Sequence, residues 1–233
     1  MIPDICGMYI LLAAATSFEI QPAIEFLRER APGPEGHEWG VLVTGIGSVA
    51  ATHSIMRQIG RVRPDIIIQA GIAGCFTGRP AGDVVVVNEE APGDTGVWEE
   101  KRFRTLFDLG LVGKDHPPFT NGYLVNPYRT LLGLSGLEGV RGVTVSTITT
   151  DPAKIGWFQQ NMAPVVESME GAALHYACLE EKIAFVQYRS VSNEIGERDK
   201  TKWDFKAAIG NLNERLIDLV RMLDQRGREV IDP

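Results

Sequence analysis

The segment Ala163-Pro164-Val165-Val166-Glu167-Ser168-Met169-Glu170-Gly171-Ala172-Ala173 (residues 163–173) changes from an apolar, β-branched run into small residues that open a helix. A strand followed at once by a helix predicts an α/β fold, in which side chains at the carboxyl ends of strands meet small ligands. A second strand, Ala184 to Tyr188, leads to Arg189-Ser190-Val191-Ser192-Asn193. We therefore expect Glu170 and Asn193 at neighbouring strand ends, on one edge of the sheet.

The rest of the chain alternates between strand-like and helix-like patterns. Bounded apolar runs predict further strands at 8–15, 41–44, 65–68, 83–87 and 142–147, and helical spacing predicts helices at 17–30, 49–59 and 202–223. Residues 91–126 are rich in Gly, Pro and charge and give no clear pattern. Because no linker or repeat interrupts the alternation, we predict a single α/β domain over residues 1–233.

Composition excludes several classes of protein. The chain of 233 residues is 44% hydrophobic, enough for one large core, and its net charge of -7 argues against a nucleic-acid partner. The apolar run 8–15 is too short for a membrane span and lacks the pattern of a signal peptide. We expect a cytoplasmic protein that does not bind a membrane.

Cysteine and histidine give no sign of a metal centre. Three cysteines show neither metal-ligand nor redox spacing, so free thiols are expected; they are Cys6, Cys75 and Cys178. Three of the histidines, His53, His116 and His175, form no ligand-spaced cluster. We therefore expect neither a metal nor a cofactor.

Gly45-Ile46-Gly47-Ser48-Val49-Ala50 matches the G-x-G-x-x-A turn of dinucleotide-binding folds. Such a site also needs an acid at the end of the following strand to bind the ribose. Here Asp65 begins that strand instead of ending it, which places the acid at the wrong edge of the sheet. We expect a tight turn that lines the pocket of a smaller ligand, and a dinucleotide-dependent oxidoreductase remains an alternative.

A second glycine-containing segment, Gln69-Ala70-Gly71-Ile72-Ala73-Gly74-Cys75, directly follows the apolar run 66–68. Glycines let backbone N–H groups approach a ligand, as in anion-binding loops, but the segment also fits a turn by which the chain leaves a strand. No Arg or Lys lies between Asp65 and Gly78. A loop that binds inorganic phosphate is expected to have a guanidinium nearby.

These segments occur in the order seen in the purine nucleoside phosphorylase and methylthioadenosine nucleosidase superfamily, which the chain resembles along almost its whole length. The matching segments are 13–19 (AAATSFE), 44–51 (TGIGSVAA), 69–74 (QAGIAG), 82–86 (GDVVV), 166–173 (VESMEGAA) and 189–193 (RSVSN). Within the superfamily, 166–173 and 192–203 (SNEIGERDKTKW) are most similar to the futalosine hydrolases of the alternative menaquinone pathway. The resemblance implies a three-layer sandwich with a central mixed β-sheet flanked by helices, and a nucleoside pocket at the strand ends.

The resemblance also assigns roles by position. Glu19 corresponds to the acid that handles the attacking water, Glu170 to the carboxylate on the ribose hydroxyls, and Asn193 to the residue that faces the purine. Further positions that line the pocket in relatives are Ile46, Ile72, Gly74, Met169 and Ser192, and Trp203 stands where relatives place an aromatic near the 5' substituent. Relatives are commonly dimers or larger, so a homodimer or larger homo-oligomer is expected.

The chemistry of cleaving an N-ribosidic bond fits these residue types. The reaction develops positive charge on the sugar and negative charge on the departing base, so a site needs an anion near the first and hydrogen-bond donors near the second. Glu19 suits the base that activates water, and Glu170 suits the group that binds the hydroxyls. Taken singly, each glutamate also fits a carboxylate that complements the dipole at a helix start.

Asn193 indicates the leaving group. A 6-oxopurine presents two acceptors, N7 and O6, and an amide NH2 offers two donors, whereas adenine presents one acceptor and one amino donor. Adenine-cleaving relatives have Asp at this position, so Asn193 predicts that hypoxanthine or guanine is released; futalosine carries hypoxanthine. The same asparagine would also fit a simple turn residue before Gly196.

Phosphate ligands separate hydrolysis from phosphorolysis. Bacterial phosphorylases of the superfamily have an arginine just before the glycine segment, where this chain has Gln69, and Ile72 replaces a serine of many relatives. Water is therefore the predicted acceptor. Arg189, or one of the cations at 198–202, is a candidate for the carboxylate of the futalosine tail. A methylthioadenosine nucleosidase, a purine nucleoside phosphorylase and a non-catalytic nucleoside-binding protein remain alternatives.

Overall fold

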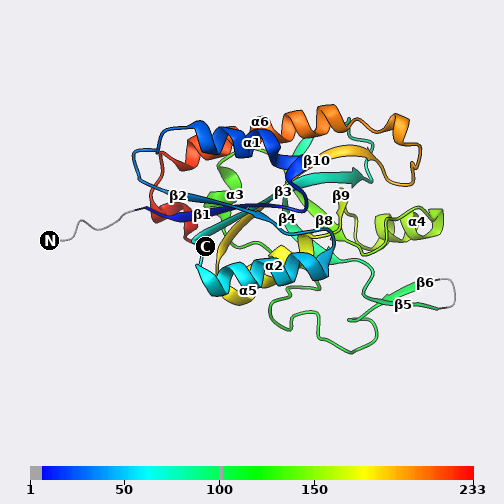
Figure 1. Cartoon of the computed structure of the whole chain (residues 1–233). Coiled ribbons are helices and arrows are strands. Elements are labelled where there is room, and N and C mark those ends of the chain that lie inside the picture. The colour runs from blue at the N-terminus through cyan, green and yellow to red at the C-terminus, as the bar shows by residue number, and fades with distance from the viewer. Residues whose placement is uncertain (1–6, 100–101) are drawn as a thin grey trace.

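A computed structural model describes residues 7–99 and 102–233, and Figure 1 shows their alternation of strands and helices. The strands are β1 (Tyr9–Ala14), β2 (Glu38–Val43), β3 (Ile66–Cys75), β4 (Val84–Pro92), β5 (Gly96–Glu99), β6 (Arg102–Thr105), β7 (Leu124–Val125), β8 (Gly139–Thr144), β9 (Val166–Ser168) and β10 (Ala184–Glu194). The α-helices are α1 (Ser17–Glu29), α2 (Ser48–Arg61), α3 (Arg129–Gly133), α4 (Pro152–Asn161), α5 (Gly171–Glu181) and α6 (Phe205–Leu223). Two 3-10 turns, Lys200–Lys202 and Arg228–Ile231, complete the elements.

A mixed eight-stranded sheet separates two layers of helices. The strand order is β10-β4-β8-β9-β3-β1-β2, with β7 paired to β4, and β5 and β6 form a separate hairpin. In Figure 1, α1 and α6 cover one face of the sheet and α2 and α5 cover the other. The predicted three-layer α/β sandwich with a mixed sheet is therefore confirmed.

Five strands of this sheet close into a ring. In addition to its antiparallel partner β4, strand β10 pairs in parallel with β3, so the path β3-β10-β4-β8-β9 returns to β3. Closure removes exposed strand edges on this side of the molecule. It also forces β3 to share its two edges among three partners.

Residues 69–75, for which an anion-binding loop or a turn out of the strand was expected, form the second part of β3. That prediction is wrong because residues 66–75 pair continuously with β10, which stabilises an extended chain through both glycines. On the other edge, β1 pairs with residues 66–69 and β9 pairs with Gly74 and Cys75. Residues 70–73 have no ladder partner on this edge within the described chain, so a gap opens between the ends of β1 and β9.

The strand predicted over residues 163–166 also starts later than expected, at Val166. Ala163 adopts φ 45° and Pro164 lacks a backbone N–H, so the ladder of β9 begins at Val166 and includes Glu167 and Ser168. The expectation of neighbouring strand ends for Glu170 and Asn193 is likewise wrong. β9 and β10 lie on opposite edges of β3, which stands between them.

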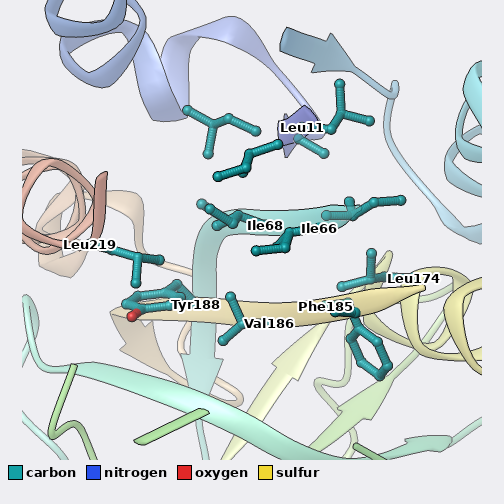
Figure 2. Packing of buried hydrophobic residues seen from close by; sticks show 14 of the residues in the cluster. Leu11, Ile66, Ile68, Leu174, Phe185, Val186, Tyr188 and Leu219 are labelled. Atoms are coloured by element: carbon teal, nitrogen blue, oxygen red, sulfur yellow. The ribbon is translucent and has the colours of Figure 1, made fainter. Parts of the chain in front are cut away.

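The core lies between the sheet and its helices. Figure 2 shows this packing around β3, between β1 and β10, with labelled side chains Leu11, Ile66, Ile68, Leu174, Phe185, Val186, Tyr188 and Leu219. Each of these residues is at most 1% exposed. Complete burial of one such side chain stabilises the fold by about 1.5–3 kcal/mol, so this layer fixes the strands that carry the site.

Two sequence expectations concern other parts of the chain. Cys75 and Cys178 are free and buried, whereas Cys6 lies outside the described residues. Within the described ranges, no helix has the length and apolar character needed to cross a membrane.

Candidate active site

A cavity of about 320 Å³ opens at the gap beside β3. It is lined by the end of β1, the start of α1, the middle of β3, the β9–α5 junction and the end of β10. Nine of the ten predicted site residues line this cavity: Glu19, Ile46, Ile72, Gly74, Met169, Glu170, Ser192, Asn193 and Trp203. The structure therefore brings together residues that are up to 184 positions apart in the chain.

Glu19 is held at the start of α1 by three hydrogen bonds. Its Oε2 accepts from the backbone N–H and the hydroxyl of Thr16, at 3.1 and 2.9 Å, which completes a capping box. Its Oε1 accepts from the backbone N–H of Ile72 at 3.1 Å, at the gap in the β3 ladder. The carboxylate thus bridges the helix start and the open edge of the sheet, and it faces the cavity.

Glu170 stands between β9 and α5, where it is the residue before the first helical turn. Its Oε1 accepts from the backbone N–H of Gly47 at 2.9 Å, and the Ser48 hydroxyl donates to the carbonyl of Met169 at 3.0 Å. The G-x-G turn therefore binds a carboxylate of the protein itself. Asp65, which accepts from the backbone N–H of Tyr9 at 2.8 Å, lies at the other end of β3, too far along the strand to serve a dinucleotide at this turn.

Arg189 is the predicted site residue that does not line the cavity. Its side chain is 2% exposed, donates to Oε1 of Gln69 at 3.0 Å and lies 3.8 Å from Oε2 of Glu170. The predicted contact between Arg189 and the substrate tail is not supported, because β10 turns this side chain into the protein behind the carboxylate. A cation thus exists near the site, but it is buried and occupied by Gln69 and Glu170.

Asn193 and Ser192 both face the cavity because β10 has an irregularity there. The register with β3 shifts between Val191 and Asn193, and such a bulge lets consecutive side chains point to the same side. The amide oxygen of Asn193 accepts from the Ser192 hydroxyl at 2.8 Å, and Nδ2 donates to the carbonyl of Glu194 at 2.9 Å. One of the two amide N–H groups is therefore engaged, and one remains for a ligand.

The remaining walls are largely apolar. Ile46, Ile72 and Met169 line the cavity, as do Trp203 and Phe205, whose ring centroids are 5.5 Å apart. The indole N–H of Trp203 donates to the carbonyl of Glu197 at 3.1 Å, which fixes the ring. Such a pocket, with apolar walls and a few polar groups, is typical of small-molecule sites.

Sequence reasoning gave no role to Glu167, which also lines the cavity. It belongs to the strand-to-helix motif, but its direction depends on the register of β9 with β3, which the sequence does not reveal. Burial raises the pKa of the Glu167 carboxyl, while the hydroxyl and the backbone N–H of Thr149 lower it. With Glu19 and Glu170, it makes three carboxylates around one cavity.

The charges around the cavity have one sign. No Lys or Arg is found among the described residues that line it. Nor do residues 7–99 and 102–233 contain a cluster of three or more His, Cys, Asp or Glu that could hold a metal ion. The carboxylates therefore favour hydroxyl groups and other hydrogen-bond donors beside them, and they disfavour an anionic group at the same place.

Comparison with known proteins identifies the class. A profile of the Phosphorylase superfamily matches residues 33–223, so the chain belongs to this superfamily, as predicted. Similar proteins include the futalosine hydrolases of Acidothermus cellulolyticus (29% identity, 87% of this chain and 86% of the relative) and Thermus thermophilus (30% identity, 77% and 80%). A solved methylthioadenosine/S-adenosylhomocysteine nucleosidase of Colwellia psychrerythraea with adenine shares the fold at TM-score 0.76 and 21% identity, over 93% of this chain and 96% of that one.

Proposed function

We propose that the protein hydrolyses the N-ribosidic bond of futalosine and releases hypoxanthine and dehypoxanthinyl futalosine. The observation that carries this proposal is the meeting of Glu19, Glu170 and Asn193 in one cavity, where the described lining residues include no cation. Similarity to futalosine hydrolases along most of the chain supports the choice of substrate. The proposed substrate is a small nucleoside, and no nucleic acid, metal or cofactor takes part.

Each polar group has a role that follows from its position. Glu19 accepts a proton from the attacking water, because its carboxylate is fixed at the cavity wall by Thr16 and Ile72. Glu170 retains free lone pairs beyond its bond to Gly47 and accepts from the ribose hydroxyls, which also stabilises the positive sugar. Asn193 donates its remaining N–H to the leaving purine, on which negative charge develops.

Water is favoured over phosphate as the acceptor. A phosphate dianion in this cavity would face three carboxylates and would lose its hydration, and none of the lining residues that the structure describes is a cation that could replace it. Arg189 is the nearest buried cation identified beside Glu170, and it already has partners in Gln69 and Glu170. The place taken by an arginine in phosphorylases therefore carries an amide that binds a buried arginine instead.

We also propose a homodimer or larger assembly in the cytoplasm. Apolar side chains at the rim of the cavity are exposed, namely Phe18 (67%), Ile46 (65%) and Ile148 (43%), and Val49 close by is 87% exposed. A second copy that covered this rim would close the pocket. Light scattering measures the assembly. The buried free thiols of Cys75 and Cys178 are consistent with a reducing compartment, which cell fractionation tests.

The proposed reaction is tested with three nucleosides. Futalosine, inosine and methylthioadenosine are incubated with the protein, with and without phosphate, and the released base and sugar are identified. We expect hypoxanthine and a free sugar from futalosine, at a rate independent of phosphate. Adenine release as the main activity would contradict the role of Asn193, and strict dependence on phosphate would contradict hydrolysis.

A variant separates an enzyme from a binding protein. Glu19→Gln is expected to lower kcat by about 100-fold or more, because the base is lost, while hypoxanthine still binds. Glu29→Gln, at the exposed end of the same helix, is the matched control and should retain wild-type turnover. Normal turnover by Glu19→Gln would show that Glu19 is not the base, and binding without turnover by the wild type would favour a binding protein.

A further inference from the structure

Asn213 of α6 carries a buried amide that bonds the backbone of α1 at the proposed base. The residue is 2% exposed, and its Nδ2 donates to the carbonyl of Glu19 at 2.9 Å and to the carbonyl of Ile209 in its own helix at 2.7 Å. Its Oδ1 accepts from the backbone N–H of Ala23 at 3.0 Å. Both N–H groups and the oxygen of the amide are therefore engaged, which fixes its orientation. Asn213 is not among the described residues that line the cavity, and the hydrolysis proposed above gives it no role.

The two groups of α1 that Asn213 bonds are those that a regular helix pairs with each other. In an α-helix the N–H of Ala23 would donate to the carbonyl of Glu19, four residues earlier. Here α1 is kinked at Ile20, whose φ of -123° and ψ of 16° are not helical, and Pro22, which has no N–H, lies in the same turn. A side chain inserted between the N–H and carbonyl groups of a turn is one cause of such a kink. The amide of Asn213 therefore sets the angle between the first turn of α1 and the rest of the helix.

This first turn of α1 carries the carboxylate of Glu19 to the cavity. Its Oε1 accepts from the backbone N–H of Ile72 at 3.1 Å and its Oε2 from the hydroxyl of Thr16 at 2.9 Å, while the backbone carbonyl of the same residue accepts from Asn213. Figure 1 shows α6 beside α1 on one face of the sheet, and the two helices are in contact. The backbone of Glu19 is thus fixed by a residue 194 positions further along the chain.

We propose that Asn213 is a positioning residue of this site: its amide holds the kink of α1 and, through the backbone of Glu19, directs the carboxylate towards the attacking water. The inference rests on the proposed function for the role of Glu19, and it adds a residue that does not touch the substrate. Its physical basis is that a reactive group must be held within about 0.5 Å of its productive position by residues whose own orientation is fixed.

Removal of the amide tests this role. Asn213→Ala leaves the carbonyl of Glu19 and the N–H of Ala23 without the side chain that joins them. We expect kcat for futalosine to fall about 10- to 100-fold with little change in KM, because the base is misplaced and the groups that bind the substrate are not.

Asn211→Ala is the matched control. Asn211 is an exposed residue of the same helix, and its Nδ2 donates to the carbonyl of Gly82 at 2.8 Å. The variant therefore loses a bond of the same kind, between α6 and a backbone carbonyl, that does not involve α1. It should retain wild-type kcat, and thermal unfolding compares the stability of the two variants.

A double substitution separates positioning from a structural role. In Glu19→Gln the base is absent, so a residue that acts through Glu19 has nothing left to direct. Adding Asn213→Ala to Glu19→Gln should lower the remaining kcat by less than about twofold, whereas independent effects would multiply. Steady-state kinetics of the full-length protein measures the four combinations. A further loss in the double variant as large as that in Asn213→Ala alone, or wild-type kcat in Asn213→Ala, would overturn the proposal.

Pro22→Ala extends the test to the case in which Asn213→Ala does not fold. Alanine at position 22 supplies an N–H and lets α1 form a regular helix, in which Ala23 bonds the carbonyl of Glu19 directly. Pro22→Ala combined with Asn213→Ala should regain thermal stability and keep the low kcat, because the kink is not restored. Recovery of kcat together with stability, or loss of the fold in both variants, would assign Asn213 to stability alone and overturn the proposal.

Wild-type turnover in the same preparations separates this proposal from the proposed function. A wild type that hydrolyses futalosine, with Asn213→Ala equally active, would overturn the role of Asn213 alone. If inosine or methylthioadenosine is cleaved in place of futalosine, the proposed substrate is wrong, and the variants are compared on that nucleoside. A wild type that cleaves none of the three would overturn both proposals.

Discussion

Glu19 combines two roles that its sequence context presents as alternatives. A glutamate three positions after Thr16 fits a capping box, and the structure contains one. The same carboxylate reaches the backbone N–H of Ile72 across the gap in β3 and lines the cavity. Fixing a reactive group through the contacts that begin a helix costs little additional conformational entropy, since those contacts are needed for the helix itself. The geometry of the proposed base therefore depends on the close approach of α1 to β3.

Gly71 permits that approach, and its substitution tests how much the site depends on it. A Cβ at this position would lie 2.5 Å from Nη1 of Arg189 and 2.9 Å from Oε1 of Glu19. Gly71→Ala must displace one of these groups, each of which is held by hydrogen bonds. We expect kcat for the nucleoside to fall about 10- to 100-fold, because misplacement of a catalytic group by about 1 Å has effects of this size. Steady-state kinetics measures the change.

A helical glycine provides the control for this substitution. Gly60 of α2 has no neighbouring atom within 4 Å of the position that a Cβ would take, so Gly60→Ala meets only open space. It should leave kcat unchanged and should slightly stabilise the helix, by about 0.5–1 kcal/mol. If Gly71→Ala and Gly60→Ala have equal activity, the packing of Gly71 between Arg189 and Glu19 is not needed for turnover.

Among the elements, β10 shows best what a sequence pattern can and cannot provide. The β-branched and aromatic run 184–188 predicts a strand, but the strand continues to Glu194 because β3 pairs with it along its whole length, whereas β4 pairs with residues 187–190. The bulge that turns both Ser192 and Asn193 to the cavity comes from this pairing. A local pattern contains no information on register, and for the same reason the orientations of Arg189 and Glu167 were not predictable. Residues in strand-to-helix turns, such as Glu170, were predictable because the turn itself marks the strand end.

The segment that follows β10 places a cation beside Trp203, an aromatic residue that lines the cavity. The guanidinium of Arg198 lies over the Trp203 ring, 5.7 Å from its centroid, whereas Lys202 pairs with Glu197 at 2.6 Å. If the 5' tail of futalosine stacks near Trp203, its carboxylate meets Arg198. Arg198→Ala should raise KM for futalosine about 10-fold and leave KM for inosine, which lacks the tail, unchanged.

The contrast between two substrates makes this prediction specific to the tail. Lys206→Ala removes an exposed cation from the start of α6 and serves as the control for general electrostatic attraction. Steady-state kinetics with both nucleosides at constant ionic strength measures the effects. An equal rise of KM for futalosine and inosine in Arg198→Ala would show that Arg198 stabilises the segment and does not bind the tail.

Considered as a whole, the molecule places a buried polar cluster behind the candidate site, within and beside the closed ring of strands. Glu90 of β4 accepts from the Thr144 hydroxyl at 3.1 Å, and the same hydroxyl accepts from the backbone N–H of Ala172 at 2.7 Å. His175 of α5 is fully buried, with Nδ1 3.0 Å from the carbonyl of Leu124. These groups connect the ring to the helix that follows Glu170, so their charge states affect the stability of the entire fold.

The contributions of Glu90 and His175 to the free energy of unfolding are expected to change in opposite directions as the pH changes. Burial raises the pKa of Glu90 to about 7, so its contribution to stability is complete below about pH 4.5 and is lost as the pH rises through about 7. Burial lowers the pKa of His175 to about 4, so its contribution is complete above about pH 6.5 and is lost as the pH falls through about 4. The pH ranges over which the two contributions change overlap, and the changes have opposite signs. The free energy of unfolding of the wild type should therefore depend little on pH through these groups between about pH 5 and 6.5.

Substitution of either group should reveal the pH dependence of stability that the other group causes. Relative to the wild type, Glu90→Gln should become more stable as the pH rises from about 5 to 8, and His175→Gln should become more stable as the pH falls from about 7 to 4.5. Each change should reach roughly 3 kcal/mol, at about 1.4 kcal/mol per pKa unit. Urea unfolding at several pH values, followed by tryptophan fluorescence, measures the free energy of unfolding, with Glu180→Gln on the exposed face of α5 as the control. Profiles of Glu90→Gln and His175→Gln that run parallel to that of the wild type would show that neither group titrates with folding, and that the polar cluster is not linked to stability through protons.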